Sequence, residues 1–281
     1  MHQILAPLLI ALSALTAYGQ PAPWPPAPTT LRLLPVEELR QNTLEPRLGN
    51  GTVVDPRDWP ASFYAEYEVG GQRLACTSTL VGPRSLLTAA HCIADGGRVE
   101  LQREGRIYEG QCERPHPGYP EPISADWALC LMTEHVPAHR YETISLSVNT
   151  LRRGGNLLLA GFGCQRIGGT SDGKFRTGPA FIEHPPGEIT GDANFLATFA
   201  AVERGDAFIC PGDSGGAVFQ EPPGFERIVV AVNSHYDTPG RGVSYLSVLG
   251  TSAGQAFLRD WASRHGQLLC GVHNDAPNCR R

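Results

Sequence analysis

The sequence of 281 residues has a single lysine, Lys174, and no interior apolar run long enough to cross a bilayer. Its 28 acidic residues outnumber its 23 basic ones, which gives a formal net charge of -5. This balance provides no basic field for nucleic acid, and no basic run is present for an anionic membrane surface. We therefore expect neither nucleic acid nor a membrane among the partners of this protein.

No two cysteines have the Cys-x-x-Cys spacing that brings thiolates together in many zinc sites. The eight cysteines are an even number and are spread widely along the chain. This pattern predicts four disulfides formed in an oxidising compartment, with no metal and no other cofactor. The count alone leaves roughly a hundred pairings open.

The N-terminus has the features of a secretory signal. Residues 4–17 are an apolar run too short to span a bilayer, and Ala17-Tyr18-Gly19 has small residues at the two positions that a signal peptidase reads. The alternative is a buried core helix, but the five prolines between Pro21 and Pro28 would interrupt its continuation. We expect a signal peptide at 1–19, a Pro-rich propeptide at 20–47 and a secreted, extracellular protein.

From residue 48 onward the sequence is typical of an all-β domain. Short β-rich runs are separated by Gly, Pro, Asn and Asp, which predicts many short strands in a sandwich or barrel. One helix is predicted at about 251–264, where Ala253, Ala256, Phe257 and Trp261 recur at helical spacing after a Ser/Thr cap. The predicted strands are 63–69, 74–81, 106–112, 127–132, 156–160, 227–233 and 243–249.

Three short strings contain the residues needed for acyl transfer: TAAHC at 88–92, ADWAL at 125–129 and PGDSGG at 211–216. A serine hydroxyl is a poor nucleophile unless an imidazole takes its proton, and the imidazole needs a buried carboxylate to orient it. We therefore predict catalytic roles for His91, Asp126 and Ser214. The rival aspartates, Asp58 and Asp95, are not followed by an apolar strand.

These strings resemble the chymotrypsin/trypsin family of serine peptidases, whose His, Asp and Ser occur in this order. The resemblance implies two six-stranded antiparallel β-barrels with a C-terminal helix, and endopeptidase activity on proteins or peptides through an acyl-enzyme. Gly212 and Ser214 would supply the N–H groups of the oxyanion hole. The α/β-hydrolase pattern Gly-x-Ser-x-Gly also fits 212–216, but that fold places its histidine after the serine and alternates strands with helices.

The resemblance also implies a zymogen. In this family the residue equivalent to Asp213 pairs with the α-amino group that activation creates, and the cut follows a basic residue. Cleavage between Arg47 and Leu48 would leave a mature peptidase domain of 48–281, expected to be monomeric. Leu48 suits the usual buried aliphatic position, whereas Gly49 departs from the family's valine.

One disulfide, Cys76–Cys92, is implied by the resemblance and would brace His91. Expected strand neighbours predict the other three: Cys112–Cys130, Cys164–Cys210 and Cys270–Cys279. The family usually pairs the cysteine four residues before its serine with one in a loop that corresponds here to 234–247, where no cysteine occurs. The wall of the specificity pocket should therefore differ from that of the family.

Phe208 occupies the position where trypsin-like enzymes have an aspartate that selects Arg or Lys. We therefore predict no preference for basic residues, unless Asp206 reaches into the pocket. The expected substrate-binding rim is Ser234, His235 and Tyr236. His235, with Arg241, could favour an acidic residue as in the glutamyl-endopeptidase branch, but small or uncharged residues are equally open.

If the enzyme does not cut after arginine, a separate activating protease is required at Arg47. A second class of function is a non-catalytic binding or scaffold protein on the same fold, since fold alone does not determine function. Such relatives typically lose a residue of the triad or the glycines around the serine. All of these are present here.

Overall fold

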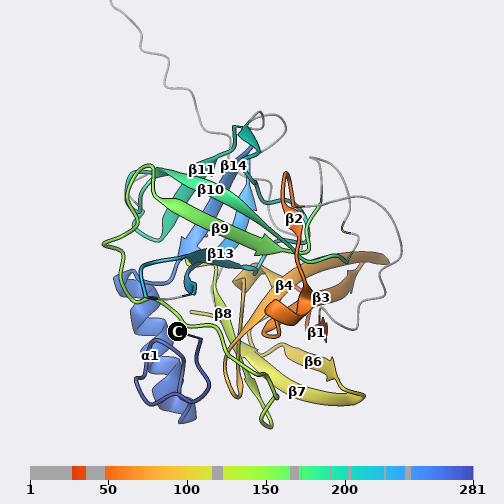
Figure 1. Ribbon diagram of the computed structural model, residues 1–281. Helices are drawn as coiled ribbons and strands as arrows, with labels where there is room; N and C mark the ends of the chain where they lie inside the picture. Colours follow the sequence, from red (N-terminus) through yellow and green to blue (C-terminus); the bar gives the residue numbers. More distant parts are fainter. Residues whose placement is uncertain are drawn as a thin grey trace, which may run out of the picture.

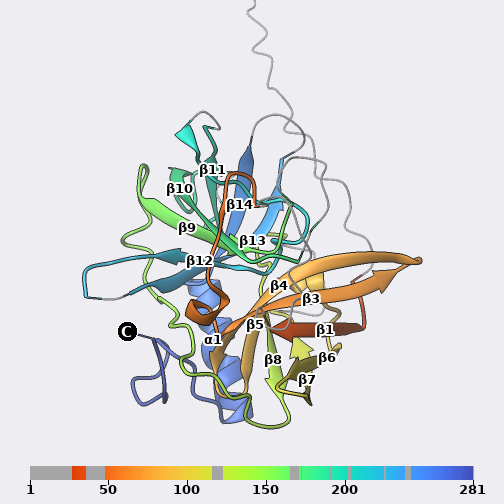
Figure 2. The ribbon, with the colours of Figure 1, turned by 45° about the vertical axis from the view of Figure 1, so that its right-hand side comes forward.

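The computed structural model describes residues 27–35, 48–115, 123–164, 171, 173–189, 192–201, 204–224, 226–237 and 242–280. This part of the chain forms two β-barrels and one C-terminal helix, which Figures 1 and 2 show from two directions. The expectation of an all-β, two-barrel fold is confirmed. None of the helices in the described residues has the length and apolarity needed to cross a membrane.

The first barrel has seven strands, not the six that we expected, in the closed order β1-β3-β4-β5-β8-β7-β6. The additional strand, β1, comes from the segment that the sequence assigned to the propeptide. Figure 2 shows it beside β3 and β6. The strands are β1 (Thr30–Pro35), β3 (Ser62–Val69), β4 (Gln72–Gly82), β5 (Ser85–Thr88), β6 (Arg98–Arg103), β7 (Arg106–Glu113) and β8 (Ala128–Met132).

The second barrel runs in the order β11-β14-β13-β12-β9-β10 and is closed by pairing between β10 and β11. The short strand β2 (Thr52–Val53) extends this sheet by pairing with β10. The strands of the ring are β9 (Asn156–Gly161), β10 (Arg176–His184), β11 (Phe195–Phe199), β12 (Ala217–Gln220), β13 (Ile228–Tyr236) and β14 (Val243–Val248).

The burial of each strand follows its sequence pattern. In β7 the residues Tyr108, Gly110 and Cys112 are buried and those between them are exposed, as expected for a strand with one face in a core. By contrast, β5 is buried at all four positions, including Ser85 and Thr88. One apolar cluster fills the first barrel and extends to Trp261 on the helix and to part of β9, β12 and β13, and a second cluster lies within the second barrel.

The predicted helix is α1 (Ser252–His265), and its ends carry the expected caps. The Thr251 hydroxyl accepts a hydrogen bond from the Gly254 N–H at 3.1 Å, which satisfies a donor that the helix itself cannot. Gly266 ends the helix in the left-handed conformation, with φ of 59°. Phe257, Leu258 and Trp261 form its buried face.

All four predicted disulfide pairings are present. Cys112 and Cys130 lie directly opposite each other on β7 and β8. Among the described residues no cysteine is free. The disulfides therefore link segments from residue 76 onward and none that comes before it.

Candidate functional site

His91 and Asp126 meet where the first barrel faces the second. His91 lies in a short 3-10 turn, Ala90–Cys92, after β5, and Asp126 lies just before β8. The His91 backbone N–H donates to Asp126 Oδ1 at 2.9 Å, and the ring Nδ1 lies 2.7 Å from Oδ2. The Ser234 hydroxyl donates to the same Oδ2 at 2.5 Å. Three contacts therefore hold the Asp126 carboxylate toward the imidazole.

The environment of Asp126 favours its ionised form. Complete burial alone would raise the pKa of this carboxyl, because a charge is poorly solvated away from water. The charge and hydrogen bonds of His91, with the hydrogen bond from Ser234, outweigh burial and lower the pKa below its ordinary value. An ionised, fixed carboxylate is what an imidazole needs in order to act as a base.

Ser214 reaches the same place from the second barrel, in the loop before β12. Thr77 on β4 holds this loop: its N–H donates to the Ser214 carbonyl at 2.7 Å, and its hydroxyl donates to the Gly212 carbonyl at 2.8 Å. The Ser214 Oγ lies 3.5 Å from the Ser234 carbonyl oxygen. Thr77 was not among the residues that sequence reasoning selected, although it follows the predicted disulfide cysteine Cys76.

The glycines around Ser214 permit a turn that no other residue could make. Gly215 has φ of 82°, and a Cβ there would lie 2.3 Å from the Thr77 carbonyl oxygen. Within the part of the chain that the structure describes, the N–H groups of Gly212 and Ser214 have no acceptor. The loop therefore presents two donors next to a serine hydroxyl, as an oxyanion site requires.

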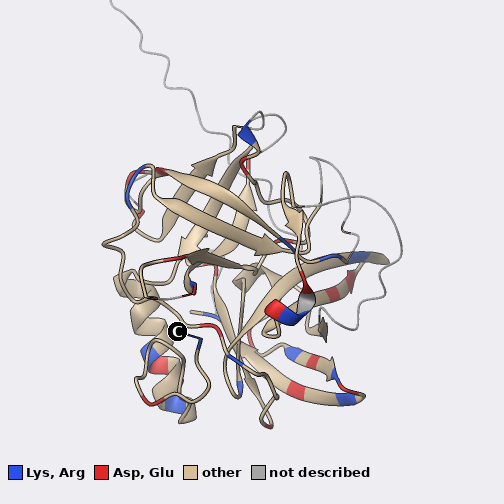
Figure 3. Cartoon of the chain, viewed as in Figure 1, with Lys and Arg blue, Asp and Glu red and all other residues tan. Residues whose placement is uncertain are grey.

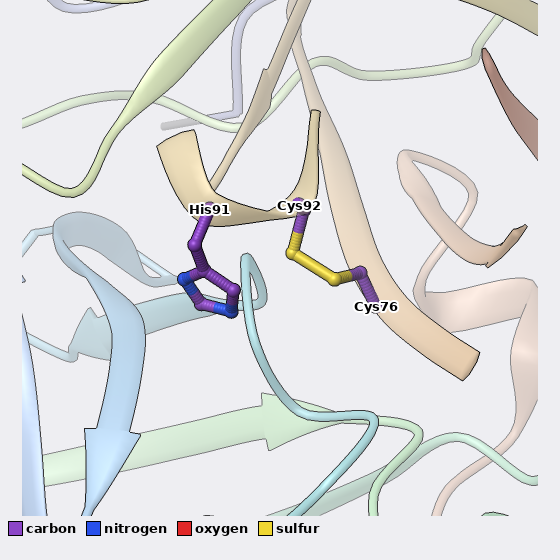
Figure 4. A group of neighbouring side chains, drawn as sticks. All are labelled: Cys76, His91 and Cys92. Atoms are coloured by element: carbon purple, nitrogen blue, oxygen red, sulfur yellow. A yellow bond between two sulfur atoms is a disulfide. The ribbon is translucent and has the colours of Figure 1, made fainter. Parts of the chain in front are cut away.

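Figure 4 shows His91 beside the Cys76–Cys92 disulfide. One ligand atom from each of these three residues lies within 4.8 Å of the others. Metal binding by cysteine requires a thiolate, and here the two sulfur atoms are bonded to each other. The group therefore supports the position of His91 and does not form a metal site.

Asp213 precedes Ser214, and its side chain packs against Gly161 and Gly163 at the end of β9. It is completely buried, and its carboxylate accepts hydrogen bonds from the Gly163 N–H at 2.7 Å and the Cys210 N–H at 3.0 Å. Burial is the main cause that raises its pKa to about 7, while the two hydrogen bonds and the nearby charge of Arg176 partly oppose it. The hydrogen bonds and the nearby positive charge therefore do not offset the effect of burying this carboxyl.

Leu48 lies close to that carboxyl. Its side chain is fully buried in the core of the second barrel, and its N–H donates to the Cys164 carbonyl at 3.0 Å. The neighbouring residue, Gly163, binds Asp213. Arg47 lies outside the described residues, as does the expected signal peptide.

Phe208 was expected to line the specificity pocket, but its ring packs against Gly49. The Phe208 N–H donates to the Gly49 carbonyl at 3.2 Å, and an ideal Cβ on Gly49 would lie only 2.2 Å from the ring. The two departures from the family pattern are therefore one feature, because the ring fills the space of the missing side chain. The Asp206 carboxylate does not replace Phe208 in the pocket, since it binds Arg204 and the Ala201 N–H.

Restoring a side chain at position 49 is expected to destabilise the protein. Gly49→Val should lower the free energy of unfolding by about 1–3 kcal/mol, because its branched side chain would overlap the Phe208 ring. Phe208→Ala alone should cost about 3–5 kcal/mol through the cavity that it leaves. The double variant should lose about 1–3 kcal/mol less free energy of unfolding than the sum of the two single losses. Urea unfolding of the four proteins measures this, and strictly additive losses would contradict the packing argument.

Two of the three expected rim residues, Ser234 and His235, have buried side chains. The Ser234 side chain is fully buried and turned to Asp126, so only its backbone can contribute to a rim. His235 is also buried, stacked on Tyr245 at 4.4 Å and edge-on to Phe195. Burial lowers the pKa of His235 to about 4, so it is uncharged at neutral pH. It therefore provides no positive charge for an acidic substrate.

Tyr236, at the end of β13, is partly exposed and remains available to a substrate. Arg241 lies outside the described residues. Of the four expected pocket residues, the structure leaves only Tyr236 with a partly exposed side chain, and His235 provides no charge for an acidic preference. Preference for a small or uncharged residue is consistent with the described part of the site.

Two barrels with a His–Asp pair on one and a serine loop on the other define a chymotrypsin-like architecture. The Trypsin family model matches residues 49–248. The chain belongs to the trypsin-like serine peptidase family. The match begins just after Leu48 and does not include β1.

Two human relatives have related sequences. The chain is 28% identical to kallikrein-11 over 193 residues, covering 56% of this chain and 61% of the relative, and 29% identical to kallikrein-5 over 138 residues, covering 45% and 46%. The chain thus spans about half to three fifths of the length of these relatives.

Solved structures of lower sequence identity share the fold. Human heparin binding protein has a TM-score of 0.56 at 21% identity, with 77% of this chain and 95% of that chain covered. GrC has a TM-score of 0.58 at 21% identity, with 77% and 98% covered. At this level of identity, the likeness concerns the fold alone.

Proposed function

We propose that this protein is a secreted serine endopeptidase that hydrolyses peptide bonds through a triad of Ser214, His91 and Asp126. The observation that carries the proposal is the buried His91–Asp126 pair, whose 2.7 Å contact faces the loop that presents Ser214. Membership of the trypsin-like family supports it. Four disulfides support an oxidising, extracellular location, as does the signal peptide expected from the sequence at 1–19.

In this mechanism Ser214 Oγ attacks the substrate carbonyl carbon while His91 takes the hydroxyl proton. The N–H groups of Gly212 and Ser214 stabilise the resulting oxyanion. His91 then gives the proton to the leaving amine, which leaves an acyl-enzyme at Ser214. Water attacks this ester with His91 again as base, and the carboxylic acid product is released. Asp126 holds the imidazole in the required tautomer throughout.

Activation is proposed to occur by cleavage between Arg47 and Leu48, by a separate protease. Leu48 has φ of 130°, a value that residues with a side chain rarely adopt. This torsion is defined by the bond to Arg47, so cleavage removes it together with its strain. The new α-amino group would lie at the Cys164 carbonyl, one residue from the Gly163 N–H that binds Asp213. An ammonium group there supplies further positive charge near Asp213.

The primary specificity is proposed to be for residues other than Arg and Lys. Phe208 provides no negative charge where trypsin-like enzymes need one, and the Asp206 carboxylate is bound elsewhere. His235 is uncharged at neutral pH, which argues against an acidic preference. Small or uncharged side chains therefore suit the site best, beside Tyr236.

A cleavage-site profile tests both levels of the proposal. The chain cleaved before Leu48 is incubated with a peptide library, alongside a Ser214→Ala variant prepared in the same way. We expect cleavage by the wild type alone, with Arg and Lys disfavoured on the acyl side. Efficient cleavage after Arg or Lys would overturn the specificity and leave the activity standing. The same preparations treated with a fluorophosphonate should be labelled only when Ser214 is present.

The alternative is a non-catalytic binding protein on the same fold, a fold that this chain shares with human heparin binding protein. Heparin is a polyanion, whereas the formal charge here is -5. Basic and acidic residues are interspersed along β6 and β7 (Figure 3). Absence of both labelling and peptide cleavage after verified processing would favour this alternative over the peptidase.

A further inference from the structure

The strand β1 lies upstream of the proposed activation cleavage, yet it is part of the first barrel. Its backbone pairs on both sides: antiparallel with β3, where Leu33 is opposite Ala65, and parallel with β6, where Leu33 is opposite Leu101. The barrel closes through this strand, since β1 stands between β3 and β6 in the strand order. Without β1, both neighbouring strands would have an unpaired edge.

The side chains of β1 alternate as in an interior strand. Leu31 and Leu33 are completely buried in the core of the first barrel, whereas Thr30 and Arg32 are exposed. Removal of this segment would therefore expose apolar core as well as two strand edges. This arrangement predicts tight retention of the segment.

The segment also supports the chain that follows His91. The Ala94 N–H donates to the Pro28 carbonyl and the Arg98 N–H donates to the Thr29 carbonyl, each at 2.8 Å. Ala94 is three residues after His91 along the chain. The position of β1 and that of the proposed catalytic histidine are therefore linked through backbone hydrogen bonds.

No covalent bond other than the main chain ties this segment to the barrel. The first cysteine of the sequence is Cys76, and all eight cysteines pair with one another. The family match also begins after the segment, at residue 49. Cleavage before Leu48 would thus create a separate short chain.

We propose that residues 27–35 stay in the barrel after activation, so that the active enzyme consists of two non-covalently associated chains. The space between β3 and β6 is a binding site for an extended peptide with branched aliphatic residues at alternate positions, and its occupant is this chain's own β1. The proposal rests on the cleavage in the proposed function. It assigns a lasting structural role to a segment that the sequence alone identifies as a propeptide.

The test separates retention from activity. The chain from Gln20 is prepared with a site for a sequence-specific protease directly before Leu48, is cleaved completely and is analysed by native mass spectrometry and size exclusion. We expect the 20–47 fragment to remain bound both with and without reductant and to dissociate only in denaturant. Its separation in native buffer, with the 48–281 chain still folded, would overturn the proposal. Retention without activity would instead contradict the proposed function alone.

Matched variants locate the interaction. Leu31→Asp with Leu33→Asp should release the fragment after cleavage, while Arg32→Gln on the exposed face of the same strand should retain it. If the double variant does not fold, a synthetic peptide of residues 27–35 is added to the 48–281 chain from which the 20–47 fragment has been removed. We expect saturable binding and a raised Tm, with the peptide carrying both aspartates binding roughly a hundredfold more weakly. Equal effects of the two peptides would overturn the proposal.

Discussion

Asp126→Asn is expected to lower the kcat of the cleaved enzyme by about four orders of magnitude, with little effect on its fold. The Asp126 carboxylate accepts from both the His91 backbone and the His91 ring. An asparagine can present its NH2 group to the ring nitrogen, which then must act as acceptor. The proton moves to the other ring nitrogen, which can then no longer accept the proton of the Ser214 hydroxyl. Ester hydrolysis by active-site-titrated enzyme measures the effect.

Two variants serve as controls for this result. Asp95→Asn should leave kcat unchanged, because Asp95 is exposed and accepts from the Arg114 backbone N–H, not from His91. Ser234→Ala removes the third donor to Asp126 and should reduce kcat by roughly tenfold to a hundredfold, as expected for a hydrogen bond to a charged group. Retention of more than a tenth of the activity in Asp126→Asn would contradict the assigned role.

Local strings of sequence predicted the residues that meet at the site. The sequence around Ser214 has glycine where the backbone passes so close to Thr77 that a Cβ cannot fit. The glycines in the sequence therefore indicate the turn directly. Strand positions were predicted equally well where alternation was clear: β7 (Arg106–Glu113) was expected at 106–112. Such features depend on neighbouring residues, which a sequence displays directly.

The side-chain directions in the specificity region depend on distant contacts. Ser234 lies at a register shift between β13 and β14, and such a bulge changes the direction of a side chain. This shift turns its hydroxyl to Asp126. Phe208 turns to Gly49, a residue more than 150 positions away in the sequence. Neither direction has a local signature, so the sequence supported only the expectation that these residues line a pocket.

The strand β1 was missed for a related reason. Its alternation of Leu31, Arg32 and Leu33 is short, and the prolines before it are typical of an exposed linker. It becomes a strand because its backbone pairs with β3 and β6. These two strands lie about 30 and 70 residues further along the chain. Non-local pairing thus determined the one difference in barrel architecture from the expectation.

Asp213→Asn is expected to have opposite effects before and after activation. In the uncleaved chain the folded pKa of Asp213 is about 7, against an ordinary value of 3.8, because the carboxyl is buried. Between these pH values the folded state keeps a proton that the unfolded state has released, so stability falls as pH rises through this window. Asparagine resembles the protonated form and avoids this loss.

The uncleaved variant should therefore match the wild type near pH 4 and be more stable near pH 8, by a difference on the order of a few kcal/mol. Urea unfolding at the two pH values measures this. The difference between the two proteins, and not the wild-type curve alone, isolates Asp213 from other titrating groups. An equal difference at both pH values would contradict the raised pKa.

After cleavage before Leu48, the Asp213→Asn substitution should abolish the gain in catalytic activity that cleavage gives the wild type. The new ammonium group needs an anionic partner, and a buried charge left without one costs about 3–5 kcal/mol. Activity of the processed variant should fall by roughly two to three orders of magnitude. Leu48 sits in the core beside Ala207 and Ile209, so the loss of this ion pair would disturb the loop that leads to Ser214. A processed variant as active as the wild type would show that activation does not act through Asp213.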